Sequence, residues 1–224
     1  MDSMRSKLDA LSGRGQEWGP LRIGGEFEIA PQLLSEPLVP LNVLPGAGYY
    51  ATGRAALTDI LVAVQCSRPG DTVLVPDYVC ASVYQAVVGA GLSPVQYQVA
   101  SDLSVDVDAL VSLAREHRGS VVAVLLVDYF GLSDCDLWAA EFKYECPCVP
   151  VIRDSVQALF EMDRRGADDF RFSSLRKWLP TPDGAPIVVG DGSVLRPTEA
   201  EGDFVAEKLL GNIERHWTRH VAPG

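Results

Sequence analysis

Positive charge is scarce in this sequence. Its 224 residues include 19 Lys and Arg against 30 Asp and Glu, which gives a formal net charge of -11. A field of this sign repels polyanions, so the composition argues against binding to nucleic acid or to anionic lipid. A small anionic molecule can still bind where a pocket supplies backbone N–H groups and an arginine. We therefore expect small-molecule partners, and neither nucleic acid nor a membrane.

Long hydrophobic runs are also lacking. The longest purely aliphatic stretch covers residues 121–127, which is too short to span a bilayer, and the first 16 residues lack the apolar core of a signal peptide. The hydrophobic content of 47% is nevertheless sufficient for a buried core. These features predict a globular cytoplasmic protein.

Cysteine and histidine are few and do not follow metal-binding patterns. The five cysteines form neither the framework of a disulfide-rich secreted protein nor the paired spacing of a zinc ribbon. His216 and His220 have the i, i+4 spacing of metal ligands on a helix, but no Glu follows His216 and no third ligand is evident. We expect reduced thiols and no metal site.

From residue 49 onward, apolar residues alternate between helical and strand spacing. Strands are predicted over residues 72–76, 94–99, 121–127, 149–153, 170–173 and 187–189. Helices are predicted around residues 57–64 and over 78–90, 107–117, 134–144 and 198–216. The continuous apolar run 121–127 suits a central parallel strand that is covered on both faces. This alternation predicts an α/β domain with a mixed, mainly parallel sheet.

A turn of small residues precedes the first of these helices. Backbone N–H groups at Gly53, Arg54 and Ala55 would point out of the helix start, where the helix dipole favours a phosphate, and Gly53 allows close approach. The Arg54 guanidinium could add a charged contact. An ordinary capped helix explains the same residues.

A carboxylate and an amide follow the strand predicted over 149–153. Because ligands of open α/β sheets lie at the carboxyl ends of strands, Asp154 would face such a crevice, with Gln157 three residues beyond it. A carboxylate there could keep a pyridinium nitrogen protonated and make the ring an electron sink. The alternative interpretation is a helix cap after a strand.

Lysine occurs only four times, and Lys177 alone follows a strand-like segment and precedes a rigid loop rich in Pro and Gly. A lysine that forms a Schiff base needs partial burial and a neighbouring cation, here Arg176, to lower its pKa. The alternative is a solvated basic turn that carries a surface tryptophan, Trp178.

In their order along the chain and in the spacing between them, these motifs resemble those of the DegT-type sugar aminotransferases. This family is a branch of the fold-type-I pyridoxal-phosphate (PLP) enzymes. The resemblance runs over about residues 24–190. Its markers are Thr52-Gly-Arg-Ala-Ala-Leu57, Pro69-Gly-Asp-Thr-Val-Leu-Val-Pro76, Gly91-Leu-Ser-Pro94, Asp102-Leu-Ser-Val-Asp106, Tyr129-Phe-Gly131, Asp154-Ser-Val-Gln157-Ala and Ser174-Leu-Arg-Lys177.

The resemblance implies a site and a reaction. Lys177 matches the catalytic lysine that binds PLP covalently and moves a proton, Asp154 the partner of the pyridine nitrogen, and Gln157 a residue that contacts the phenolic oxygen. The phosphate-binding turn corresponds to Gly53, Arg54 and Ala55. The resemblance further implies a homodimer, an amino group from glutamate or glutamine, and a nucleotide-linked keto-sugar acceptor.

Three positions depart from the family pattern. Cys80 lies where an aromatic residue usually stacks on the cofactor ring, and Phe172 lies where a serine usually binds the phosphate, which leaves Ser173 or Ser174 as substitutes. Asp128 replaces a common histidine. These changes suggest a divergent branch.

The resemblance also predicts a domain organisation. Residues 1–23 would be an N-terminal extension, 24–195 the three-layer large domain of a fold-type-I PLP-dependent transferase, and 196–224 a short tail in place of the small domain.

Two other interpretations of the function stay open. One is a catalytically inactive protein that keeps the fold for binding or regulation. The other is an enzyme with desulfurase-like chemistry that uses Cys80 as a nucleophile.

Overall fold

The computed structural model describes residues 44, 47–164, 166–195 and 202–220. The predicted N-terminal extension over residues 1–23, and the start of the large domain at residue 24, lie outside this part of the chain. Residues 198–201, the predicted start of the last helix, lie outside it too.

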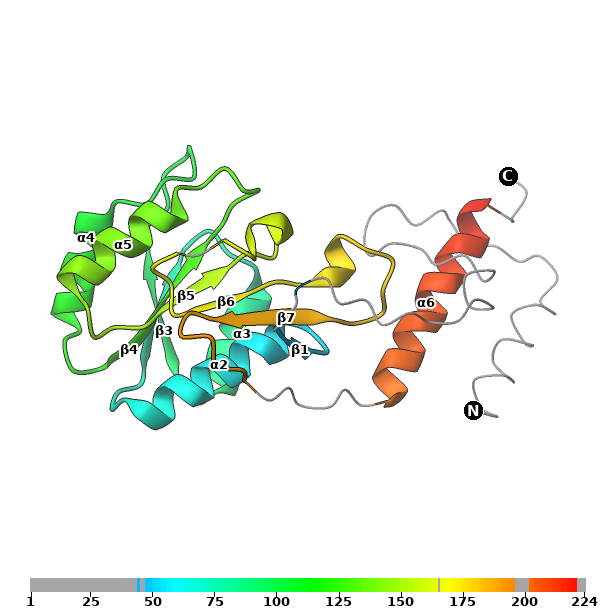
Figure 1. The fold of residues 1–224 in the computed structure, drawn as a ribbon, viewed down its shortest axis with the longest axis horizontal. Helices are drawn as coiled ribbons and strands as arrows, with labels where there is room; N and C mark the ends of the chain where they lie inside the picture. Colours follow the sequence, from blue (N-terminus) through cyan, green and yellow to red (C-terminus); the bar gives the residue numbers. More distant parts are fainter. Residues whose placement is uncertain (1–43, 45–46, 165, 196–201, 221–224) are drawn as a thin grey trace.

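A seven-stranded sheet forms the centre of the fold (Figure 1). Its order is β1-β7-β6-β5-β4-β2-β3, and β7 alone runs antiparallel to its neighbours, β6 and β1. The strands are β1 (Gly48–Tyr50), β2 (Thr72–Pro76), β3 (Ser93–Tyr97), β4 (Val121–Val127), β5 (Val151–Asp154), β6 (Phe170–Phe172) and β7 (Ala185–Val189). The predicted mixed, mainly parallel sheet is confirmed.

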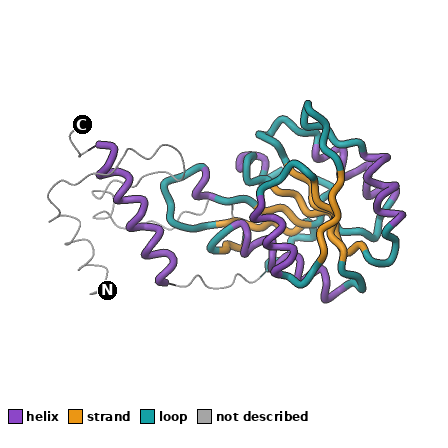
Figure 2. Tube along the Cα trace, turned by 180° about the vertical axis from the view of Figure 1, so that it is seen from behind, coloured by secondary structure: helices purple, strands orange, loops and turns teal. Residues whose placement is uncertain are grey.

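Helices cover both faces of the sheet, as the buried run of β4 requires. Two of them, α2 (Gly53–Ser67) and α3 (Ala81–Gly89), pack in one core cluster, while α4 (Val107–Glu116) and α5 (Cys135–Glu145) pack in another. Figure 2 shows the strands lying between these helices. The order helix, sheet, helix is the predicted three-layer α/β architecture.

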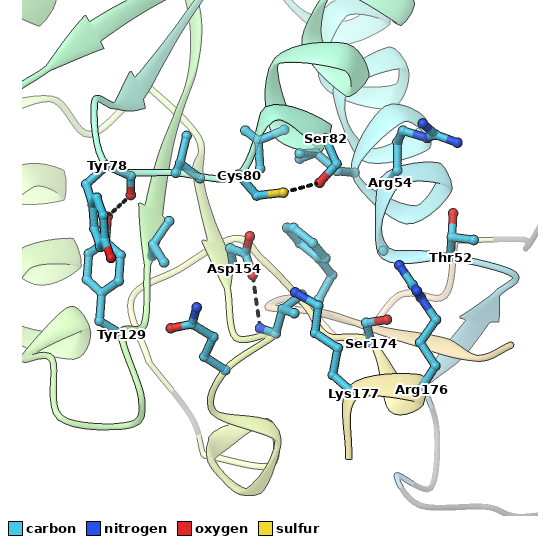
Figure 3. Close-up of a pocket in the computed structure, with 18 of the residues that line it drawn as sticks. Thr52, Arg54, Tyr78, Cys80, Ser82, Tyr129, Asp154, Ser174, Arg176 and Lys177 are labelled. Carbon is cyan, nitrogen blue, oxygen red and sulfur yellow. Dashed lines mark hydrogen bonds between the residues drawn. The ribbon is translucent and has the colours of Figure 1, made fainter. Parts of the chain in front are cut away.

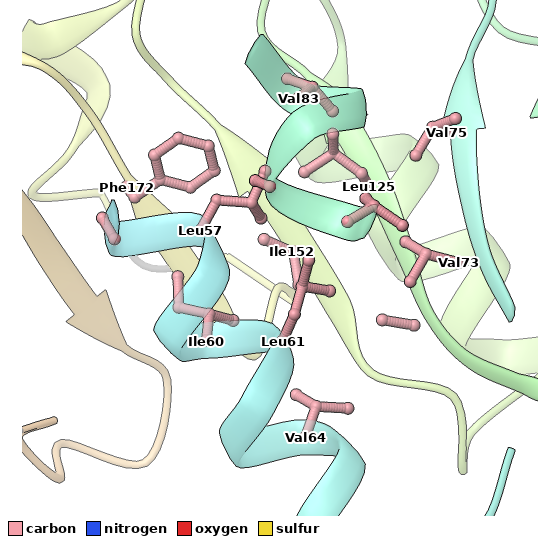
Figure 4. Packing of buried hydrophobic residues seen from close by; sticks show 14 of the residues in the cluster. Leu57, Ile60, Leu61, Val64, Val73, Val75, Val83, Leu125, Ile152 and Phe172 are labelled. Atoms are coloured by element: carbon pink, nitrogen blue, oxygen red, sulfur yellow. The ribbon is translucent and has the colours of Figure 1, made fainter. Parts of the chain in front are cut away.

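The apolar stripe of α2 anchors the helix that later positions the site. Leu57, Ile60, Leu61 and Val64 are all buried and face the sheet (Figure 4). Their i, i+3, i+4, i+7 spacing places them on one side of the helix. Burial of such side chains contributes about 1.5–3 kcal/mol each. The predicted helix is confirmed and begins at Gly53.

Some local features differ from the sequence prediction. The short strand β1 and two 3-10 turns, η2 (Leu159–Glu161) and η3 (Leu175–Lys177), were not predicted. The helix expected to begin at residue 78 begins at Ala81, because residues 77–79 form a turn and Cys80 is the helix cap. The last helix, α6 (Gly202–His220), extends four residues beyond the predicted end. None of the described helices has both the length and the apolar character needed to cross a membrane.

Two buried arginines join the strand ends to α5. Arg153 is 2% exposed and forms ion pairs with Asp128, at 2.6 Å, and Asp136, at 2.5 Å. Arg171 pairs with Asp168 at 2.6 Å and donates to the backbone carbonyls of residues 161 and 164. Buried charges of this kind are tolerated only when they are paired. The network therefore connects β4, β5, β6 and α5.

Candidate functional site

A pocket of about 590 Å³ opens where four parallel strands end. Its lining includes Asp77 directly after β2, Val127 at the end of β4, Asp154 at the end of β5 and Phe172 at the end of β6. The start of α2 and the turn η3 complete the walls. The carboxyl edge of a parallel sheet is the usual ligand site of such folds, and this volume suits a small molecule.

Asp154 is a buried carboxylate at the floor of this pocket, with 8% of its surface exposed. Its Oδ1 accepts a hydrogen bond from the Val156 N–H at 2.9 Å, and no cation of the described residues forms an ion pair with it. Burial raises its pKa from 3.8 to about 6, against the lowering effects of the Val156 N–H and of the Lys177 charge. The alternative role as a helix cap does not apply, since only the short turn η2 follows.

Lys177 projects from the turn η3 toward the pocket (Figure 3). Its side chain is exposed, so the partial burial predicted from the sequence is wrong for this chain. Within the described residues, its amine forms neither a hydrogen bond nor an ion pair. The Lys177 charge is close enough to Asp154 to act on the pKa of that carboxyl. The amine is therefore accessible from the pocket.

The surroundings of the lysine turn fix its position. The Leu175 N–H donates to the Gly184 carbonyl at 2.8 Å, and Leu175 is buried. The Trp178 indole donates to the Val156 carbonyl at 2.8 Å, which ties the turn to the segment after Asp154. Trp178 is half-buried rather than on the surface, so the alternative of a solvated basic turn is wrong for this residue.

The start of α2 offers two backbone donors to the pocket. Thr52 Oγ1 accepts from the Ala55 N–H at 3.1 Å and so caps the helix. The N–H groups of Gly53 and Arg54 have no acceptor within the described part of the chain. Both residues line the pocket, whereas Ala55 does not. Of the three residues predicted to bind a phosphate, Gly53 and Arg54 therefore offer backbone donors to the pocket and Ala55 does not.

The Arg54 side chain does not point toward the lysine. Its exposed guanidinium donates to Gln85 Oε1 on α3 at 2.8 Å. Figure 3 shows it directed away from Ser174 and Lys177. The charged contact predicted for this residue is therefore not formed by the side chain as it lies.

The remaining predicted residues also line the pocket. Gln157 has a buried Oε1 that no donor of the described residues reaches. Ser174 is 2% exposed, and its hydroxyl makes no hydrogen bond with any described residue. Phe172 packs in the core below them. The structure thus brings the predicted amide and the substitute serine into one cavity with Asp154 and Lys177.

Cys80 lies on the rim of the pocket with an exposed side chain. It accepts a hydrogen bond from the Ser82 hydroxyl at 3.3 Å, and this contact lowers the pKa of the thiol. Cys80 is thus the exposed cap of α3 and is not packed within the helix.

The sequence analysis did not assign several residues of the pocket wall to the site. Tyr129 is buried, donates its hydroxyl to the Tyr78 carbonyl at 2.5 Å and contacts the Tyr78 ring, with centroids 5.7 Å apart. Arg176 was considered only for its effect on Lys177, yet it lines the pocket itself. Lys208 reaches the pocket from α6, and no local sequence signal could have shown this.

The described residues contain no group of three or more His, Cys, Asp or Glu side chains that could hold a metal ion. The His216–His220 pair includes His220, whose side chain lies outside the described residues.

Residues 45–130 match the family model "Aminotransferase class I and II". No curated protein matches the chain significantly. Solved structures are similar over a larger part of the chain. A 3-amino-5-hydroxybenzoic acid synthase is similar with a TM-score of 0.57 and 20% identity, over 75% of this chain and 51% of its own.

Two further solved structures extend the comparison. A DegT DnrJ EryC1 StrS aminotransferase from Brucella abortus has a TM-score of 0.55 and 18% identity, over 95% of this chain and 62% of its own. The sugar aminotransferase CalS13 from Micromonospora echinospora has a TM-score of 0.52 and 17% identity, over 97% of this chain and 55% of its own. This chain therefore spans 51% to 62% of the length of the three structures. Over residues 45–130 the chain matches the aminotransferase class I and II family, and its described part has the fold of the DegT-type aminotransferases.

Proposed function

We propose that this protein binds pyridoxal phosphate in the pocket at the carboxyl edge of the sheet and acts as a sugar aminotransferase through Lys177. The observation that carries the proposal is the convergence of three groups on one pocket. They are a buried carboxylate at Asp154, an available amine at Lys177, and two backbone donors at the start of α2.

The residues present fit this cofactor. Asp154 is a buried carboxylate that forms no ion pair with any described residue, and a protonated pyridine nitrogen would supply a partner. The N–H groups of Gly53 and Arg54, together with the dipole of α2, suit a phosphate. Gln157 lines the same pocket, and its amide NH2 group could donate to the phenolic oxygen. The carboxylate, the helix start and the amide thus each have a counterpart on the cofactor.

The chemistry can be divided between the cofactor and the chain. When bound, pyridoxal phosphate supplies an electron sink for the bonds at the amino-bearing carbon. Asp154 would keep the proton at the pyridine nitrogen. Lys177 would hold the cofactor and, as a neutral amine, take up and return the proton of the substrate. The volume of the pocket leaves room for a substrate beside these groups.

The finer assignment follows from the same resemblance. We propose glutamate or glutamine as amino donor, a nucleotide-linked keto-sugar as acceptor and a homodimer as the working form. The similarity to a sugar aminotransferase supports a sugar as acceptor. The donor, the nucleotide and the dimer rest on the family resemblance alone. Residues 24–195 would be the cofactor domain and 196–224 a tail.

The first experiment is to add pyridoxal phosphate to the purified protein, reduce with borohydride and map the labelled peptide by mass spectrometry. We expect saturable labelling of Lys177 and its loss in Lys177→Ala. Two lysines serve as internal controls. Lys143 is held by Asp169 outside the pocket, and Lys208 lies in the same pocket. Labelling of Lys208 or Lys143 in place of Lys177 would contradict the assignment.

A second candidate, a non-catalytic protein that binds the cofactor, is favoured by the exposure of Lys177 and by Cys80 in the place of a stacking ring. Incubation of the loaded protein with glutamate separates the two. Conversion of the cofactor to its pyridoxamine form supports the aminotransferase, whereas labelling of Lys177 without conversion supports the second candidate.

A further inference from the structure

We propose that Arg176, rather than Arg54, supplies the cation of the phosphate subsite, and that the Ser174 hydroxyl completes this subsite. The inference rests on the proposed function, since the phosphate monoester is that of pyridoxal phosphate. It assigns a binding role to a residue that the family resemblance does not include.

The Ser174 hydroxyl is the first observation that points to a ligand. The residue is 2% exposed and lines the pocket, yet its hydroxyl has no partner within the described part of the chain. A phosphate oxygen would satisfy it.

Ser174 also lies next to the start of α2. A Cβ atom placed on Gly53 would be 3.6 Å from Ser174 Cβ, which is ordinary contact. The free N–H groups of Gly53 and Arg54 and the Ser174 hydroxyl therefore border the same corner of the pocket. Three neutral donors converge there, so the corner is suited to an anion.

Neutral donors alone do not neutralise the negative charge of the phosphate. A phosphate monoester carries a charge of about -1.5 to -2 at pH 7, and the chain itself has a net charge of -11. A nearby cation is needed. The Arg54 guanidinium is exposed and donates to Gln85, away from this corner.

Arg176 has the required position. It is half-buried, lines the pocket and belongs to the same turn as Lys177. Ser174 precedes the turn in an extended conformation, and Ser174, Arg176 and Lys177 all line the pocket. Figure 3 shows the Arg176 side chain directed toward Thr52 and the start of α2.

One turn would therefore hold both ends of the ligand. Lys177 would bind its reactive carbon, while Arg176 and Ser174 would bind its phosphate. A guanidinium is well suited to this role, because its planar donors match two phosphate oxygens at once.

The test compares two ligands that differ only in the phosphate, pyridoxal phosphate and pyridoxal. Each is titrated against the full-length chain, and binding is followed by the cofactor absorbance and by borohydride labelling of Lys177. The variants are Arg176→Gln, Ser174→Ala and Arg54→Gln, which keeps its backbone N–H and tests the alternative cation. The matched control is Arg118→Gln, which changes an exposed arginine outside the pocket. Circular dichroism checks that each variant is folded.

We expect Arg176→Gln to weaken pyridoxal phosphate binding roughly 10- to 100-fold, the usual effect of losing a hydrogen bond to a charged group. Binding of pyridoxal should change less than about 2-fold, because pyridoxal has no group for Arg176 to contact. Ser174→Ala should have a smaller effect in the same direction. Arg118→Gln should change neither ligand by more than about 2-fold, and Arg54→Gln should weaken pyridoxal phosphate binding less than Arg176→Gln does.

Two results would overturn the inference. One is an equal loss of both ligands in Arg176→Gln, which indicates a structural role. The other is a phosphate-specific loss in Arg54→Gln, or in Lys208→Gln, with Arg176→Gln unaffected. If the unsubstituted chain binds neither ligand at Lys177, the proposed function itself fails, and this outcome is distinct from the other two.

Discussion

At the scale of single residues, Asp154 shows how a site can be maintained at a cost to stability. The carboxyl is 8% exposed, and its pKa is raised from 3.8 to about 6 by burial. A raised pKa means that the folded protein binds the proton more tightly than the unfolded chain. The stabilisation that comes from proton binding at Asp154 is therefore fully present below about pH 4 and is lost as the pH rises through 6. Above that range the buried charge destabilises the protein.

This leads to a prediction for Asp154→Asn. The amide keeps the oxygen that accepts from Val156 and removes the charge, so the protein without cofactor should become more stable at pH 7.5 by about 2–3 kcal/mol. Urea unfolding at pH 7.5 and pH 5 measures this, and the gain should be smaller at pH 5. In Glu116→Gln, which changes an exposed carboxylate, stability should shift by less than about 0.5 kcal/mol.

The same substitution should have the opposite effect on binding. Loss of the negative charge removes the proposed partner of the pyridine nitrogen, so the affinity for pyridoxal phosphate should fall at least about 10-fold. If the Asp154→Asn variant is less stable without cofactor, or binds the cofactor as well as the unsubstituted chain does, the proposed role of Asp154 is wrong.

At the scale of elements, the helix α2 depends on its cap. Thr52→Ala removes the acceptor of the Ala55 N–H and should lower the free energy of unfolding by about 1 kcal/mol. Thr52→Ser retains the hydroxyl and should lie within about 0.5 kcal/mol of the original protein. Thermal and urea unfolding of the three proteins provide the measurement. Equal stability of the Ala and Ser variants would show that the cap is not needed.

The helices and strands also show which features hydrophobic periodicity can predict. The spacing of Leu57, Ile60, Leu61 and Val64 correctly predicted α2, and the apolar run 121–127 correctly predicted the central strand β4. The helix start at residue 78 was wrong, since three residues of turn separate β2 from the cap of α3. The turn η3 was missed because a single turn of three residues has no repeat for a periodic pattern to reveal.

At the scale of the whole molecule, the buried ion network holds the layers together. Asp128 of the network, 1% exposed, adjoins Asp154 through the hydrogen bond from the Asp128 N–H to the Asp154 carbonyl at 2.9 Å. Arg153 lies on β5 directly before Asp154 and pairs with Asp128. The network therefore supports the strand ends from which the pocket is built.

Arg153→Met should destabilise the fold by about 3–5 kcal/mol, because it leaves Asp128 charged and buried without its partner. Arg115→Met is the matched control, since the pair of Arg115 with Glu145 is exposed and should contribute less than about 1 kcal/mol. Chemical unfolding at one pH measures both. A loss in Arg153→Met no larger than that in the control would show that the network is not needed for stability.

The sequence alone determined the fold class and most of the site. Hydrophobic periodicity is a local property, and it was sufficient for the layers of the α/β domain. The positions of Asp154 and Lys177 could be predicted because strand ends meet at one edge of a parallel sheet. The ordered motifs predicted a phosphate-binding turn at Gly53, Arg54 and Ala55, of which Gly53 and Arg54 line the pocket.

The tertiary structure alone decided which side chains face the pocket. The direction of Arg54 depends on Gln85, 31 positions later in the sequence, and the exposure of Lys177 depends on the packing of Leu175 and Trp178. Lys208 enters the pocket from a distant helix. Such contacts arise between segments that are remote in the chain, so no local pattern of residues can specify them.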